Sequence, residues 1–313
     1  DNPYKIKEFE IEIYKNKKWT ENNIRILVSN TRIIPAKFKK RYRGQIVIKL
    51  LNNTACIFPA NIRRSGDFKD NIILYGNNIK QSLDVHLINN NIKGITKFKL
   101  FADGTKGISE DEIFLTELLR EINFISPRTF IIDATINGIK SKMLFQEKTE
   151  KEMLEYNQRV ESPIFESNEK LMMKYIEKFE NNNLNIHDIG MLPEIHKAIR
   201  VQLARQTNNE WSQKSSIHTE ISLRALSNLN SSYIKYSNSF KNEFNNFIYF
   251  QYNFDNKNLG QEHESNIIKL DIYNLILTIT NAWHGLTANN RKFYWNKTES
   301  YFEPIYYDGD VNI

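Results

Sequence analysis

The sequence predicts an α+β protein, because strand-like alternation of apolar and polar residues fills the first half and helix-like apolar spacing fills the second. The chain has 313 residues, 40% of them hydrophobic, which is enough for one large domain or two lobes. We place the boundary after Glu147, with a β-rich part over 1–147 and a helical part over 148–313.

The strands of the first part are short and separated by polar turns. Segments 9–14, 45–50 and 83–87 alternate between apolar and polar residues. Asn-rich stretches at 51–54, 76–78 and 88–91 separate such runs, as is typical of antiparallel meanders. Residues 5–100 are therefore predicted to form a sheet.

One helix is predicted within the β-rich part, over 109–123. Ser109 has the character of an N-cap, and Glu112 follows at the spacing of a capping box. Two further strands, 129–136 and 140–146, flank Asn137-Gly138, the strongest short-range signal for a β-hairpin.

Helices dominate the predicted second part. Apolar residues recur every three to four positions over 148–159, 168–181, 193–206, 217–228 and 265–279. Two short strands, 292–295 and 302–307, are expected to end the chain as a hairpin.

Composition excludes several classes of protein. The single cysteine, Cys56, excludes an internal disulfide and a multi-cysteine metal site, and its apolar neighbours predict a core position. No apolar run is long enough to span a membrane, and the first residues do not resemble a signal peptide. Because the chain begins without Met and stops inside a predicted loop, we expect a piece of a longer protein. The sequence does not indicate the cellular compartment, and association of the longer protein with the cell envelope is an open alternative.

The net charge of +6 is spread among both signs, which favours a solvated basic surface over a polyanion-binding arm. A nucleic-acid interface would draw on a basic run that contains few aromatic residues: Arg32, Lys37, Lys39, Lys40, Arg41 and Arg43. No nucleic-acid partner is expected.

The last segment carries the most chemical information. Asn290 precedes one predicted strand, and Asp308 and Asp310 follow the next, so the hairpin brings carboxamide and carboxylate oxygens to one end. Hard cations such as Mg²⁺ prefer such ligands. A simple polar turn is the alternative. The motifs of P-loop, dinucleotide-binding, zinc-protease and nucleophile-elbow proteins are absent from the sequence.

Several segments together resemble the atypical kinases related to spore coat protein H, the CotH family, from Ile62 to the end. They are an Arg-Gly turn at 62–66, a lysine-led strand at 80–87, a strand at 98–101 with the helix after it, a hairpin at 126–148 leading to Glu147, Asn289-Asn290, and the acidic loop 307–310.

The resemblance implies a two-lobed protein-kinase-like fold, with a β-rich N-terminal lobe and a helical C-terminal lobe. It implies transfer of the γ-phosphoryl group of ATP to a protein or glycan acceptor, with Mg²⁺ or Mn²⁺. By resemblance, the cofactor-binding residues are Lys80 on the phosphates, Glu117 or alternatively Glu121 pairing with it, Arg63 in the turn, and Glu147. The implied metal ligands are Asn290, Asp308 and Asp310.

The chain departs from the family pattern where an acidic residue should precede the metal-binding Asn, because Ala282-Trp283-His284 stand there. His284 is the candidate catalytic residue, since imidazole accepts protons near neutral pH. Two alternatives stay open: His284 is structural, or the chain is a catalytically inactive binding or surface-assembly module. The turn is altered too, with Arg64-Ser65 ahead of Gly66.

Overall fold

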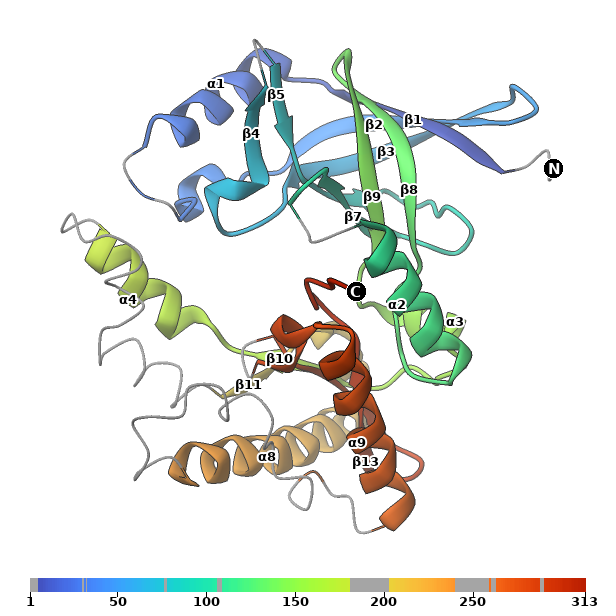
Figure 1. The fold of residues 1–313 in the computed structure, drawn as a ribbon, viewed down its shortest axis with the longest axis vertical. Coiled ribbons are helices and arrows are strands. Elements are labelled where there is room, and N and C mark those ends of the chain that lie inside the picture. Colours follow the sequence, from blue (N-terminus) through green and yellow to red (C-terminus); the bar gives the residue numbers. More distant parts are fainter. Residues whose placement is uncertain are drawn as a thin grey trace. The chain divides into compact units, whose positions relative to one another are not determined.

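The structure is a computed structural model (Figure 1) that describes residues 5–29, 31, 33–75, 78–105, 109–180, 203–239, 259, 263–287 and 290–313. The chain divides into two compact units. Unit 1 consists of Asp1–Ser109 and Arg128–Lys148, and unit 2 of Glu110–Pro127 and Thr149–Ile313. Among the described helices, none combines the length and the apolar character needed to cross a bilayer.

A closed β-barrel forms unit 1. Its strands are β1 (Ile6–Ile13), β2 (Tyr42–Leu50), β3 (Ala55–Arg64), β6 (Leu83–Leu87), β7 (Lys97–Ala102), β8 (Thr129–Ile136) and β9 (Ile139–Glu147). They follow one another around the barrel in the order β1-β2-β3-β6-β7-β9-β8. The ring closes because β1 pairs in parallel with β8, while the other neighbours are antiparallel. Closure leaves neither β1 nor β8 as a sheet edge.

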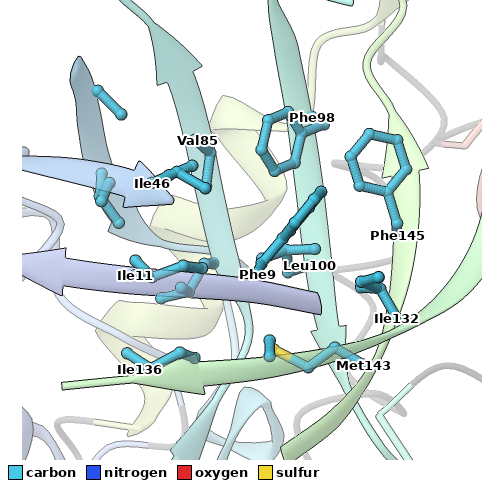
Figure 2. Close-up of a cluster of buried hydrophobic side chains, with 14 of the residues drawn as sticks. Phe9, Ile11, Ile46, Val85, Phe98, Leu100, Ile132, Ile136, Met143 and Phe145 are labelled. Carbon is cyan, nitrogen blue, oxygen red and sulfur yellow. The ribbon is translucent and has the colours of Figure 1, made fainter. Parts of the chain in front are cut away.

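Phenylalanines fill the centre of the barrel (Figure 2). The ring centroids of Phe98 and Phe145 are 4.6 Å apart, and Phe9 lies 6.0 Å from Phe98. Because successive strand residues face opposite sides, Val85 points into this core while Asp84 and His86 belong to the outer face of β6.

The remaining elements of unit 1 are a helix, a two-stranded sheet and two short 3₁₀ turns. They are α1 (Asn16–Leu27), η1 (Ala36–Phe38), η2 (Lys69–Asn71), β4 (Ile72–Tyr75) and β5 (Asn78–Gln81). The sequence did not predict α1. Its buried face carries two amides, Asn22 and Asn23, beside Trp19 and Ile26, and this weakens the apolar periodicity.

Unit 2 combines a four-stranded sheet with helices. The sheet has the order β11-β10-β12-β13. Its strands are β10 (Ile164–Ser167), β11 (Ala204–Gln206), β12 (Lys292–Asn296) and β13 (Tyr301–Ile305). The helical elements are α2 (Ser109–Glu121), α3 (Lys151–Tyr156), α4 (Lys170–Glu180), α7 (Asn209–Ser212), α8 (Ser216–Ser239), α9 (Glu264–Ile279) and η5 (Trp283–Leu286). Leu115 and Leu119 of α2 belong to the core formed with β12, β13, α8 and α9.

The expected two-lobed protein-kinase-like fold, with a helical C-terminal lobe, is wrong. The first part is not a β-rich kinase lobe, since the parallel β1–β8 pair closes its strands into a seven-stranded barrel. The second part is not a helical lobe, since β10 and β11 join the terminal hairpin in a sheet. The helix expected in the N-terminal lobe, α2, belongs to unit 2 because its apolar face packs in that unit's core.

Individual predictions fared differently. The Asn137-Gly138 hairpin is confirmed: φ is +46° at Asn137 and +87° at Gly138, and β8 pairs with β9 on either side. The helix predicted over 193–206 is wrong at its end, where Ala204–Gln206 form β11, while 193–202 lie outside the described residues. Cys56 is exposed on β3 and does not lie in the core.

Candidate functional site

The terminal segments of unit 2 bring His284 between Asn290 and Asp308. His284 sits in η5, directly after α9, while Asp308 follows β13. Its Nδ1 lies 2.9 Å from the carbonyl oxygen of Asp308 and 3.6 Å from Oδ2 of the same residue. On the other side of the ring, Nε2 lies 3.1 Å from Asn290 Nδ2. We call these three residues the His284 cluster.

The hydrogen bonds assign the protons of the cluster. A carbonyl oxygen only accepts, so Nδ1 of His284 carries the proton and donates it to Asp308 O. Nε2 then accepts from Asn290, whose Nδ2 also donates to the carbonyl oxygen of His284 at 3.0 Å. This amide orientation turns Oδ1 of Asn290, the atom able to bind a cation, away from both bonds.

The acidic loop after β13 has an unusual backbone. Asp308 and Asp310 both adopt positive φ, +51° and +54°. Left-handed geometry at a residue other than glycine costs about 1–2 kcal/mol, and aspartate tolerates it better than most. Two such residues around Gly309 indicate that the loop conformation is held by its surroundings.

Gly309 fixes the loop against its support. A Cβ there would overlap the hydroxyl of Tyr306 and lie 3.0 Å from Cβ of Ala282. Tyr306 is itself held, because its hydroxyl donates to Oε2 of the buried Glu112 at 2.7 Å. Burial and then Glu112 raise the pKa of Tyr306 well above its ordinary value, so the phenol stays a donor.

The donor set of the His284 cluster suits a hard cation. Asn290 and Asp308 each carry side-chain oxygens, and Asp310, two residues further along the chain, carries a second carboxylate at an exposed position. Mg²⁺ is commonly bound through one or two carboxylates and keeps water or phosphate oxygens in its remaining positions. Among the described residues, no group of three His, Cys, Asp or Glu side chains forms an all-protein cage.

The four residues of the predicted cofactor set lie on four different elements of the structure. Glu147 is buried and bonded through both oxygens to Arg128, at 2.6 and 2.8 Å. Glu117 is exposed on α2 and pairs with Arg120. Lys80 lies on β5, opposite Ile73. Lys80, Arg63 and Glu147 belong to unit 1 and Glu117 to unit 2.

Arg63 belongs to a second cluster, which the sequence did not predict. The carboxylate of Asp84 is only 1% exposed, and its Oδ2 accepts hydrogen bonds from Nε and Nη2 of Arg63 at 3.0 and 2.8 Å. Nη2 of Arg41 lies 3.3 Å from its Oδ1, Nε2 of His86 2.9 Å from Oδ1, and Nζ of Lys148 3.6 Å from Oδ2. We call these five residues the Asp84 cluster.

Electrostatics keep Asp84 ionised. Burial alone would raise the pKa of Asp84, but the hydrogen bond from His86 and the charges of Lys148, Arg63 and Arg41 outweigh it and hold that pKa well below its usual range. For His86, burial dominates over Asp84 and lowers the pKa. The imidazole is therefore neutral at physiological pH, and the cluster has three cations around one carboxylate.

Only strand pairing reveals this second cluster. Arg63 stands opposite Asp84 across β3 and β6, and His86 lies on β6 as well. Arg41 directly precedes β2, and Lys148 directly follows β9. Comparison with models of known protein families and with curated proteins found no match to this chain.

Proposed function

We propose that the chain is an ATP-dependent phosphotransferase, with Mg²⁺ or Mn²⁺ held by Asn290, Asp308 and Asp310 and with a protein or glycan hydroxyl as acceptor. The observation that carries the proposal is that His284 contacts both Asn290 and Asp308. Three residues expected to act together, from two segments of the chain, thus share one cluster. The proposal rests on these side chains and not on the fold.

A bound divalent cation would neutralise charge on the β- and γ-phosphate oxygens. In the transfer, the acceptor oxygen bonds to the γ-phosphorus as the bond from phosphorus to the bridging β–γ oxygen breaks, and ADP leaves. His284 is the proton acceptor for the attacking hydroxyl through Nε2, because Nδ1 keeps its proton for the carbonyl oxygen of Asp308.

One observation favours the second candidate, a module that binds the nucleotide without turning it over. Nε2 of His284 accepts from Asn290 Nδ2 at 3.1 Å, so its lone pair is occupied. Proton transfer requires that this bond be broken, whereas cation binding by Asn290 Oδ1 does not. The two candidates share the ligand and differ in what His284 does.

Calorimetric titration of ATP, with Mg²⁺ or Mn²⁺, into the chain and into Asp308→Asn tests the ligand. Asparagine tolerates positive φ and keeps the size of the side chain, so this variant removes the charge and little else. We expect affinity for the metal–nucleotide to fall at least about tenfold. The matched control is Asp271→Asn, an exposed aspartate on α9, which should bind as the unsubstituted chain does.

His284→Gln separates the two candidates. Glutamine keeps an N–H donor for Asp308 O but takes no proton. Retained ATP binding with lost phosphoryl transfer supports the phosphotransferase, and binding without transfer in either protein supports the module. If the unsubstituted chain binds no metal–nucleotide while its thermal unfolding is cooperative, both are wrong.

A further inference from the structure

We propose that the Asp84 cluster on the outer face of the barrel is a binding site for a phosphate group. This site lies within unit 1 and uses none of the residues of the His284 cluster. Its ligand is a small phosphate or diphosphate anion, bound without a metal ion. Asp84 is the positioning residue, and Arg41, Arg63 and Lys148 provide the charge.

The Asp84 cluster carries more positive than negative charge. Arg63 donates two hydrogen bonds to Oδ2 of Asp84 and by itself balances the charge of that carboxylate, yet Arg41 and Lys148 also lie within 3.6 Å of it. Burial is the largest cause that lowers the pKa of Arg41; the charge of Asp84 raises this pKa, and the charge of Arg63 lowers it further. Cations that repel one another in this way are stabilised by an anion carrying more charge than Asp84 alone.

The cations of the Asp84 cluster are accessible to solvent, whereas its carboxylate is buried. The side chain of Asp84 is 1% exposed, whereas those of Arg41, Arg63 and Lys148 are 32%, 35% and 23% exposed. The carboxylate is covered by the cations, which themselves reach solvent. Arg63 donates to Asp84 through Nε and Nη2, so its Nη1 can donate to another acceptor. A buried carboxylate thus holds the guanidinium groups of Arg41 and Arg63 in fixed orientations at the surface.

The neighbouring strand extends the same basic surface. Lys99 stands opposite Asp84, and Lys97 opposite His86, across the antiparallel pair of β6 and β7. Directly opposed residues share a face of a sheet. The outer face of the barrel therefore adds two lysines to the three cations of the Asp84 cluster, although Nζ of Lys99 also lies 5.6 Å from the ring centroid of Phe101.

A compact anion fits better than a nucleic-acid strand. Two described residues of the basic run already have partners: Lys39 pairs with Asp67, and Lys37 lies over the ring of Phe38. Of the described members of that run, Arg41 is the one that joins Asp84. Convergence of several cations on one point is typical of phosphate recognition, while strand binding needs charge distributed along a groove.

The test is calorimetric titration with orthophosphate and with pyrophosphate, in EDTA at low salt, confirmed by ³¹P NMR line broadening. Arg41→Gln and Lys148→Gln each remove one cation and leave the Arg63–Asp84 pair in place. We expect each to weaken pyrophosphate binding about tenfold, as for a lost charge-assisted hydrogen bond. Lys140→Gln removes an exposed lysine of β9 and should change affinity less than about twofold.

Thermal unfolding of each variant shows whether the barrel is intact. Equal affinities for the Arg41→Gln and Lys140→Gln proteins would overturn the proposal, as would the absence of saturable binding at millimolar pyrophosphate. A DNA or RNA oligomer that binds more tightly than pyrophosphate, with steep salt dependence, would overturn it in favour of a nucleic-acid surface. Asp308→Asn should bind metal-free pyrophosphate normally, so this proposal and the proposed phosphotransferase fail separately.

Discussion

Glu303 is a buried carboxylate of unit 2 that is bonded to two cationic side chains. Arg159 holds its carboxylate with Nε at 3.0 and 3.1 Å and with Nη2 at 2.8 Å, and Lys269 lies at 3.0 Å. Burial alone would raise the pKa of Glu303, but the hydrogen bonds and charges of Arg159 and Lys269 outweigh it and lower that pKa. The folded state therefore stabilises the ionised carboxylate.

This gives a direction for the dependence of stability on pH. A carboxyl whose pKa is lowered by folding stabilises the protein above its unfolded value of 4.5, and the contribution disappears as pH falls through the lowered pKa. We expect the free energy of unfolding to decrease with acidification below about pH 5, and Glu303→Gln to reduce this slope. Asp84 adds to it with the same sign.

Urea unfolding measured from pH 7 to pH 3 checks the prediction. At neutral pH, Glu303→Gln should cost about 3 kcal/mol, because Arg159 loses its buried partner. Glu299→Gln, at an exposed position of the same hairpin region, is the control. If Glu303→Gln is as stable as Glu299→Gln at pH 7, the ion pairs of Glu303 with Arg159 and Lys269 do not stabilise the fold.

For single residues, the sequence predicts the face of a strand on which a side chain lies better than it predicts the partners of that side chain. Alternation in 83–87 correctly puts Asp84 and His86 on the face opposite Val85. It contains nothing about Arg63, because that contact depends on the register of β3 against β6. Cys56 shows the opposite failure: an apolar neighbourhood suggested burial, but the residue lies in the exposed first part of β3.

Among the elements, β1 and β2 approach one another closely at Gly44. This residue pairs with Ile13 of β1 and Ala60 of β3. A Cβ added to Gly44 would overlap the backbone oxygen of Glu12 and lie 3.0 Å from Cδ1 of Ile62. Neither neighbour can move far, since one is backbone and the other lies in the barrel core.

Gly44→Ala should therefore destabilise the protein by about 1–3 kcal/mol, the usual cost of overpacking. Chemical denaturation followed by circular dichroism measures the loss, and Lys142→Ala, at an exposed position of β9, controls for a change on a barrel strand. An unchanged denaturation midpoint for Gly44→Ala would mean that β1 and β2 can move apart without loss of stability, and would contradict close packing at Gly44.

Elements with local signals were the predictable ones. The β8–β9 hairpin and α2 follow from Asn137-Gly138 and from the Ser109 start, which act within a few residues. Strands β10 and β11 are four and three residues long and owe their existence to pairing with each other and with β12. Such short strands carry too little periodicity to be recognised alone.

For the whole molecule, the decisive contact is the parallel pairing of β1 with β8, in which Phe9 meets Ala134. No local pattern encodes it, so the sequence predicted a sheet of antiparallel meanders without its closure, and the family resemblance implied a kinase-like arrangement. Closure has an observable consequence: both strands have neighbours on each side.

Amide hydrogen exchange measures this closure directly. Amides of Glu8–Ile11 and Asp133–Ile136 should be protected as strongly as those of β3 and β6, whereas the turn amides of Asn52 and Gly138 exchange rapidly. Alternating fast and slow exchange along β1 would instead identify a sheet edge and contradict the closed barrel.

The barrel is assembled from two stretches of chain, with α2 inserted between β7 and β8. In the finished ring the β8–β9 hairpin lies between β7 and β1. As the ribosome extends the chain, β1 to β7 emerge first and expose two open strand edges until residues 129–147 follow. A translational pause in this interval would prolong the stage at which nascent chains are prone to pair with one another, and chaperones would act on it.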